Sequence, residues 1–172
     1  MKLNPHSIKT FELLGDLEKS IGKATPFYIK DIDIGKKNFS GQFLVKNRGD
    51  FWGNYETRPY LCCMHKFANC FNVIGDKGWC VSILEEMIKL NPNDNQRVGN
   101  QLMLYLIELN PLEKFKAYDK VYKDEHSVYT FFQRAFFAYP VWRKIPGALS
   151  WLKKQTGGME NQGILPLSML LI

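Results

Sequence analysis

The spacing of apolar residues along the chain predicts a series of short amphipathic helices. In the stretch 61–94, apolar residues recur at steps of three and four, which is the period of one face of an α-helix. One set ends before Gly75-Asp76, which predicts a turn, and a second set ends at Asn91–Asp94. The two sets are Met64, Phe67, Ala68 and Phe71, then Val81, Leu84, Met87, Ile88 and Leu90. The pattern predicts a helical hairpin, which needs neighbours to bury its apolar faces.

Similar patterns before and after this hairpin predict further helical units. The approximate boundaries are 5–40, 59–94, 95–125 and 127–160, with an irregular connector over 38–58. Within the first unit, Thr25-Pro26 predicts the start of a helix, because threonine caps helices and proline suits their first turn. The aromatic residues Phe51, Trp52 and Tyr55 are expected to fill the gap that the irregular connector leaves. The whole chain is predicted to form one all-α domain of stacked antiparallel helix pairs.

The 61–94 hairpin resembles a tetratricopeptide repeat (TPR). The small and aromatic residues that this family carries in its first helix match Ala68 and Phe71, and its turn glycine matches Gly75. The closing proline matches Pro92, whereas Cys80 replaces the alanine that usually opens the second helix.

Three further motifs narrow the resemblance. They are Phe51-Trp52-Gly53, Glu56–Tyr60 and Leu90–Gln96, and they resemble a group of TPR-like proteins related to the suppressor-of-tumorigenicity family. Most members of this group are uncharacterised bacterial proteins, and the likeness runs in order from about Leu3 to Leu170. It implies a short right-handed solenoid that acts as a non-enzymatic scaffold for protein–protein interaction. A partner segment is then expected on its concave surface.

The resemblance also suggests which side chains contact a partner. The concave surface of TPR proteins is lined by first-helix residues, and the matching positions here are His65, Asn69, Arg97 and Gln101. Arg58 and Tyr60 are further candidates, since an Arg fork and an aromatic anchor often serve in recognition. A structural role is favoured for this pair, with Thr57 capping a helix that begins near Pro59 and Arg58 paired to Glu56 or to a nearby carbonyl.

A metal site and a catalytic site are both disfavoured by the sequence. The four cysteines, Cys62, Cys63, Cys70 and Cys80, contain no zinc-knuckle spacing, and we interpret them as reduced thiols that pack between helices. The chain has no nucleophile elbow, P-loop or dinucleotide fingerprint. A thiol enzyme built on Cys63 remains a minor alternative, and Glu85-Glu86 is interpreted as a solvated helix face. No catalytic residue, metal or cofactor is therefore expected.

A second function is suggested by the last third of the chain. The net charge of the 172 residues is +6, and 126–159 contains five basic residues and no acidic one. The basic residues are Arg134, Arg143, Lys144, Lys153 and Lys154, with aromatic residues between them. Basic and aromatic side chains together bind single-stranded nucleic acid or another polyanion. Helical spacing favours the alternative that these aromatic residues belong to a core.

Hydrophobic residues make up 45% of the chain and charged residues 23%, which is typical of a globular protein rather than a disordered one. No apolar run approaches the length of a membrane span, and Met1–Pro5 lacks the apolar core of a signal peptide. We therefore expect a cytoplasmic protein without membrane insertion. Exposed terminal repeats would also permit oligomer formation.

Overall fold

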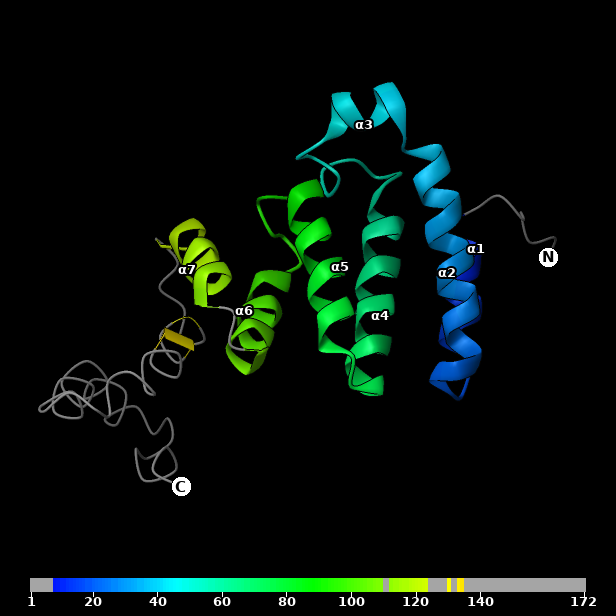
Figure 1. The fold of residues 1–172 in the computed structure, drawn as a ribbon. Helices are drawn as coiled ribbons and strands as arrows, with labels where there is room; N and C mark the ends of the chain where they lie inside the picture. Colours follow the sequence, from blue (N-terminus) through cyan, green and yellow to red (C-terminus); the bar gives the residue numbers. More distant parts are fainter. Residues whose placement is uncertain (1–7, 110–111, 124–129, 131–132, 135–172) are drawn as a thin grey trace, which may run out of the picture. The chain divides into compact units, whose positions relative to one another are not determined.

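The computed structural model describes residues 8–109, 112–123, 130, 133 and 134. Within these residues it contains seven α-helices and no strand, so the predicted all-α class is confirmed for this part of the chain. The chain divides into two compact units, residues 1–116 and 117–172. The helices are α1 (Ile8–Leu17), α2 (Ile21–Asn38), α3 (Gly41–Asn47), α4 (Arg58–Ile74), α5 (Lys77–Leu90), α6 (Val98–Leu109) and α7 (Leu112–Val121) (Figure 1).

The first hairpin consists of α1 and α2, and α2 begins earlier than Thr25-Pro26 predicts. The backbone N–H groups of Lys23 and Ala24 already donate to the Ser20 carbonyl, which places Pro26 inside the helix. The Thr25 hydroxyl donates to the Ile21 carbonyl at 2.7 Å and does not cap the helix. The prediction was wrong because burial of Ala24 upstream of the proline extends the helix toward the α1–α2 turn.

The connector that follows α2 contains α3 and a tightly packed aromatic cluster. The rings of Phe39, Phe43, Phe51 and Tyr60 contact one another with centroid separations of 5.1–6.4 Å. Phe51 is fully buried and so fills the gap as predicted. Tyr55 is 80% exposed, which contradicts the same prediction for that residue, because its turn directs the ring into solvent.

The central hairpin of α4 and α5 has the predicted boundaries. Gly75 ends α4 with a left-handed φ of 92°, a conformation that glycine adopts without steric cost. Asp76 then caps α5, because its carboxylate accepts a hydrogen bond from the Trp79 N–H at 3.2 Å. Cys63, Ala68 and Cys80 are fully buried, so the cysteines at 63 and 80 pack as small residues in the core.

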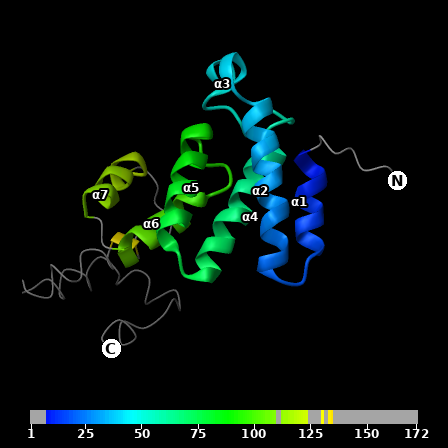
Figure 2. The same ribbon diagram turned by 45° about the vertical axis from the view of Figure 1, so that its right-hand side comes forward.

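Within the first unit, helices pack mainly against their neighbours in the chain. Helix α4 packs against α1, α2 and α5, and α5 packs against α6. Figures 1 and 2 show α2, α4 and α5 side by side, with α1 covering the back of α2 in the first view. Polar contacts join α4 to α1 and to α6, and Figure 1 shows α2 and α5 on either side of α4.

Helices α6 and α7 form at the predicted apolar pattern that follows Pro92. The α5 residue Glu85, expected on a solvated face, is largely buried and accepts a hydrogen bond from Lys114 at 3.0 Å.

The predicted unit 127–160 lies outside the described residues apart from Thr130, Gln133 and Arg134. Among the helices that the structure describes, none is long and apolar enough to span a bilayer.

Candidate functional site

A groove runs along one face of α4 in the first unit. Four α4 side chains form its floor: Tyr60, Met64, Phe67 and Phe71. Their spacing of four, three and four residues keeps them on one helix face over about 16 Å. The groove has a volume of about 650 Å³, which is within the range of ligand-binding pockets.

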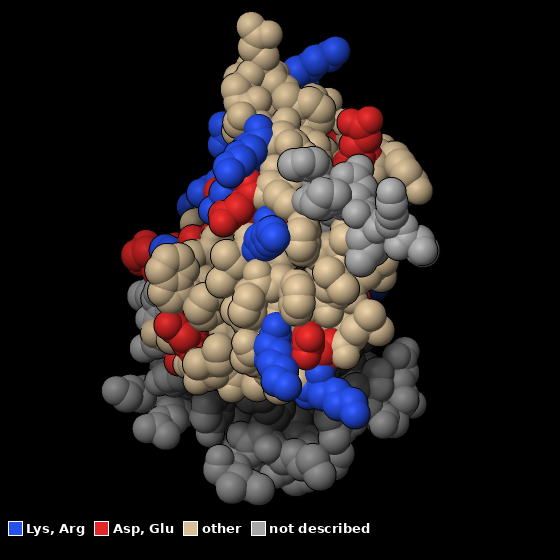
Figure 3. All heavy atoms as spheres, turned by 90° about the vertical axis from the view of Figure 1, so that its right-hand side faces the viewer, with Lys and Arg blue, Asp and Glu red and all other residues tan. Residues whose placement is uncertain are grey.

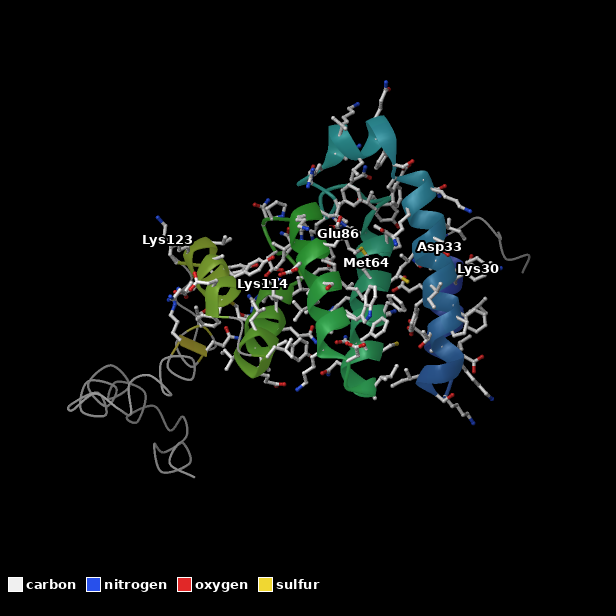
Figure 4. The ribbon with its side chains drawn as sticks, viewed as in Figure 1. Lys30, Asp33, Met64, Glu86, Lys114 and Lys123 are labelled. Carbon is white, nitrogen blue, oxygen red and sulfur yellow. The ribbon has the colours of Figure 1, made fainter. Side chains whose placement is uncertain are left out.

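The walls of this groove are apolar side chains from α2, α3 and α5. Helix α5 contributes Trp79, Ile83 and Leu90, and Trp79 stacks on Phe71 with ring centroids 6.0 Å apart. Trp79 is nevertheless 60% exposed, so most of its ring faces solvent at the groove mouth. Figure 4 shows Met64 on the floor, between Asp33 of α2 and Glu86 of α5. The other apolar wall residues are Ile32, Phe39, Leu44 and Phe51.

Close contact between α2 and α4 shapes one end of the groove. A Cβ atom at Gly35 would lie 2.2 Å from the Tyr60 ring, so glycine permits this approach. Tyr60 is 5% exposed, and burial raises its pKa to about 12. Its ring therefore contributes apolar surface to the groove, and its hydroxyl stays protonated at neutral pH.

The charged residues of the groove are few and lie at its rim. Lys36 lines the α2 wall and Glu86 the α5 wall, together with the hydroxyl residues Ser40 and Ser82. Glu86 is paired with Lys89 at 3.5 Å one turn further along α5. The site therefore offers apolar surface with a few exposed, solvent-screened charges at its rim, which suits binding of an apolar group.

The opposite face of α4 carries a network of hydrogen bonds that includes three of the sequence-predicted partner residues. His65 Nε2 and Gln101 Oε1 are 2.8 Å apart, and Gln101 Nε2 donates to Asn69 Oδ1 at 2.7 Å and to the Tyr105 hydroxyl at 2.9 Å. Asn69 lies nine residues after Tyr60, which is roughly 180° around the helix. The structure brings His65, Asn69 and Gln101 together as predicted. Their polar groups, however, form hydrogen bonds with one another rather than standing free for a partner.

The remaining residues of the predicted partner surface lie apart from this network. Arg97 is exposed in the turn before α6, with a left-handed φ of 56°. Arg58 donates from Nε to the Trp52 carbonyl at 2.5 Å, and its guanidinium lies over the Trp52 ring. Thr57 bonds from its hydroxyl to the carbonyls of Phe51 and Asn54 and does not cap α4 with its side chain. Arg58 and Thr57 thus hold the connector in place. Of the two pairings predicted for Arg58, with Glu56 or with a nearby carbonyl, the structure shows the carbonyl.

A second cavity, of about 440 Å³, lies beside the α1–α2 turn. Lys66 there donates to Glu12 at 2.7 Å and to Asp16 at 2.6 Å. Burial lowers the pKa of Lys66, but the hydrogen bonds to Asp16 and Glu12 outweigh it and raise that pKa above its usual range. Lys66 is therefore fully paired, with its single ammonium group between two carboxylates. Figure 3 shows that the face carrying α1 and α2 has basic and acidic side chains interspersed.

The surroundings of the thiols differ from those that a reactive cysteine needs. Cys63, Cys70 and Cys80 are buried, and Cys62 is partly exposed. Burial raises the pKa of Cys62 and Cys63, and it raises the pKa of Cys80 to about 11. A thiolate nucleophile needs a lowered pKa and access to substrate. In the described residues, no three Cys, His, Asp or Glu side chains form a group that would hold a metal ion.

In the second unit, the structure describes only Arg134 among the polyanion candidates. Its guanidinium donates to Asp119 at 2.6 Å and to the Tyr122 carbonyl at 3.1 Å, so an intramolecular carboxylate already neutralises it. The other candidates lie outside the described residues: Arg143, Lys144, Lys153 and Lys154. Polyanion binding by this region stays a prediction.

Of the apolar groove residues on α5, the sequence pattern singled out Leu90 but not Trp79 or Ile83. Trp79, Ile83 and Leu90 recur at helical spacing on a face next to the buried stripe of Cys80, Leu84 and Met87. One packing interface requires only one apolar stripe, so the second stripe was the sequence signal that could have revealed the groove wall.

We compared the chain with protein-family models, with curated proteins and with solved structures, and none of them matches it.

Proposed function

We propose that this chain is a TPR-like, non-enzymatic interaction module that binds an apolar segment of a partner protein in the groove between α2 and α5. The observation that carries the proposal is the open, largely apolar groove with Trp79 exposed at its mouth. Exposed aromatic surface is costly to maintain, and covering it contributes roughly 25 cal/mol for each Å² removed from water.

The rigidity of the groove supports binding of this kind. Its floor and two of its walls belong to helices that pack directly on one another, α2 on α4 and α4 on α5. A preformed site loses little conformational entropy when a partner docks, so more of the gain from apolar burial appears as affinity. Aromatic anchors such as Trp79 commonly dominate the energetics of such contacts.

The choice of this face differs from the surface that the TPR resemblance implies. That surface would use His65, Asn69 and Gln101, whose polar groups already bond to one another. A partner there would have to replace satisfied hydrogen bonds, which yields little net free energy. The groove offers apolar surface without such a cost. The raised pKa values of Cys62, Cys63 and Cys80 disfavour a thiol enzyme.

Selection from a displayed library of random 16-residue peptides tests the proposal, with the full chain as bait. We expect enriched peptides to have apolar residues at three- and four-residue spacing. Their affinity should fall at least tenfold for Trp79→Ala and stay unchanged for Tyr55→Ala, an exposed aromatic control outside the groove. Peptides that bind both variants equally, or an unenriched library, would overturn the proposal.

A further inference from the structure

We propose that the occupant of the groove is one face of an amphipathic helix of about three turns, with acidic residues at the end that lies against α3. This inference rests on the proposed function and names the chemistry of the partner. It draws on the length of the groove and on the unequal distribution of charge along it.

The groove has the dimensions and periodicity of a helix-binding site. The floor residues Tyr60 to Phe71 span about 16 Å, which equals about three turns of a docked helix. The α5 wall repeats the same period with Trp79, Ile83 and Leu90. The apolar side chains of a helix at i, i+3 or i+4, and i+7 match such a surface. A volume of about 650 Å³ suits those side chains, with the helix backbone left outside.

One end of the groove is closed by the C-terminus of α2 and by α3, and this end is basic. Gly41 and Leu44 of α3 line it, together with the basic residue Lys36. Three further basic residues, Lys37, Lys46 and Arg48, belong to the same stretch, residues 33–50, but lie outside the groove lining, and the exposed acidic residues of this stretch are Asp33 and Asp50. None of these side chains forms an ion pair with another described residue, and Lys36, Lys37, Lys46 and Arg48 are all exposed.

The other end of the groove is electrically neutral and aromatic. Phe71 and Trp79 stack there, and the nearby Asp76 carboxylate is occupied in capping α5. Between the two ends, Glu86 is paired with Lys89. Unpaired positive charge therefore remains only at the α3 end among the described groove residues. A helix with acidic residues at this end gains attraction, whereas the reversed helix does not.

Three synthetic peptides of 16 residues, designed as helices with one common apolar face, test the inference on the full chain. The first has three Glu residues at one end, the second Gln at the same positions, and the third Lys. We expect affinity in the order Glu, Gln, Lys. The preference for Glu over Gln should shrink between 50 and 300 mM salt, as it does for exposed charges. Higher salt shortens the Debye length and so screens exposed charges more strongly.

Matched variants of the protein locate the charge effect. Lys36→Glu, Lys37→Glu and Lys46→Glu combined should weaken the Glu peptide about tenfold and strengthen the Lys peptide. The control combines Lys9→Glu, Lys19→Glu and Lys23→Glu, which changes the net charge equally at exposed positions of α1, α2 and their turn. The control should leave the order of the peptides unchanged. Circular dichroism confirms that both variants fold.

The outcomes separate the two proposals. If no peptide binds, or if Trp79→Ala does not weaken them, the groove function itself fails. If all three peptides bind equally through Trp79, the groove function stands and the acidic partner is ruled out. Displacement of the Glu peptide from the basic end by single-stranded oligothymidine, with the apolar contact to Trp79 unchanged, assigns that end to nucleic acid and also overturns the inference.

Discussion

The two faces of α4 use the same helix for opposite purposes. One face carries Met64 and Phe67 into an open apolar groove, and the other carries His65 and Asn69 into a closed set of hydrogen bonds with α6. His65 and Asn69 both bond to Gln101. On the groove face, Phe67 keeps partly exposed apolar surface, whereas Met64 is 5% exposed. The comparison teaches that the polar residues near a helical-array surface can belong to its packing, while its binding capacity resides in unburied apolar side chains.

The largest expected effect on stability comes from a buried carboxyl group between α2 and α4. Asp31 of α2 is fully buried against α4, and neither carboxylate oxygen has a hydrogen-bond partner among the described residues. The neighbouring Cys63 thiol donates to the Tyr28 carbonyl. Burial, and to a smaller extent Glu12, raises the pKa of Asp31 to about 7, while Cys63 and Lys66 act in the opposite direction.

Ionisation of Asp31 should therefore destabilise the fold. A carboxyl whose pKa is higher in the folded state contributes stability below its unfolded pKa of 3.8 and loses it as pH rises through about 7. The loss corresponds to about 4 kcal/mol at most. Asp31→Asn should remove this part of the pH dependence, as measured by urea unfolding at pH 4.5, 6 and 8. Parallel pH profiles for the two proteins would contradict the prediction.

The next prediction compares two glycines of α2, one packed against the groove wall and one exposed. The comparison separates the contribution of packing from that of intrinsic helix propensity. Gly35→Ala should destabilise the protein by about 1–3 kcal/mol, because its Cβ atom would collide with the Tyr60 ring. Gly22→Ala in the same helix has open space around it and should stabilise by about 0.5 kcal/mol. Thermal unfolding of both variants measures the contrast, and equal shifts would show that α2 and α4 are further apart.

The polar face should affect stability and leave binding unchanged. Gln101→Ala removes the residue that bonds to His65, Asn69 and Tyr105, which should cost about 1–2 kcal/mol for these partly buried partners. Peptide affinity at the groove should stay within twofold, since Gln101 lies on the other side of α4. Chemical unfolding and fluorescence anisotropy measure the two quantities. A large loss of affinity would return the partner site to the predicted concave surface.

The smallest effect on stability is expected on the groove face. Trp79→Ala removes a largely exposed ring and one aromatic stack, which should cost about 1 kcal/mol or less. Peptide affinity should nevertheless fall at least tenfold. This pattern is the reverse of that for Gln101→Ala, so the pair of variants tests the comparison directly. The same unfolding and anisotropy measurements suffice.

Local patterns predicted the helices well where a clear stop signal bounded them. Gly75 and Asp76 separate α4 from α5 as expected, because a left-handed glycine and an N-cap carboxylate act through adjacent backbone groups. Pro26 misled the prediction of α2, because packing of Ala24 and Tyr28 supplied the free energy to continue the helix across it. The TPR resemblance also grouped His65, Asn69 and Gln101, but it did not reveal that they bond to one another.

The sequence by itself determined the helical class and the apolar faces, since both follow from the 3.6-residue period and from local stop signals. Only the tertiary structure decided which apolar faces are covered. The stripe of Cys80 and Leu84 is buried in the core, whereas the stripe of Trp79 and Ile83 borders an open groove. The two stripes look alike in sequence, so the sequence does not show which of them is buried. Burial depends on the distance between α2 and α5 across α4, and contacts between residues remote in the chain set that distance.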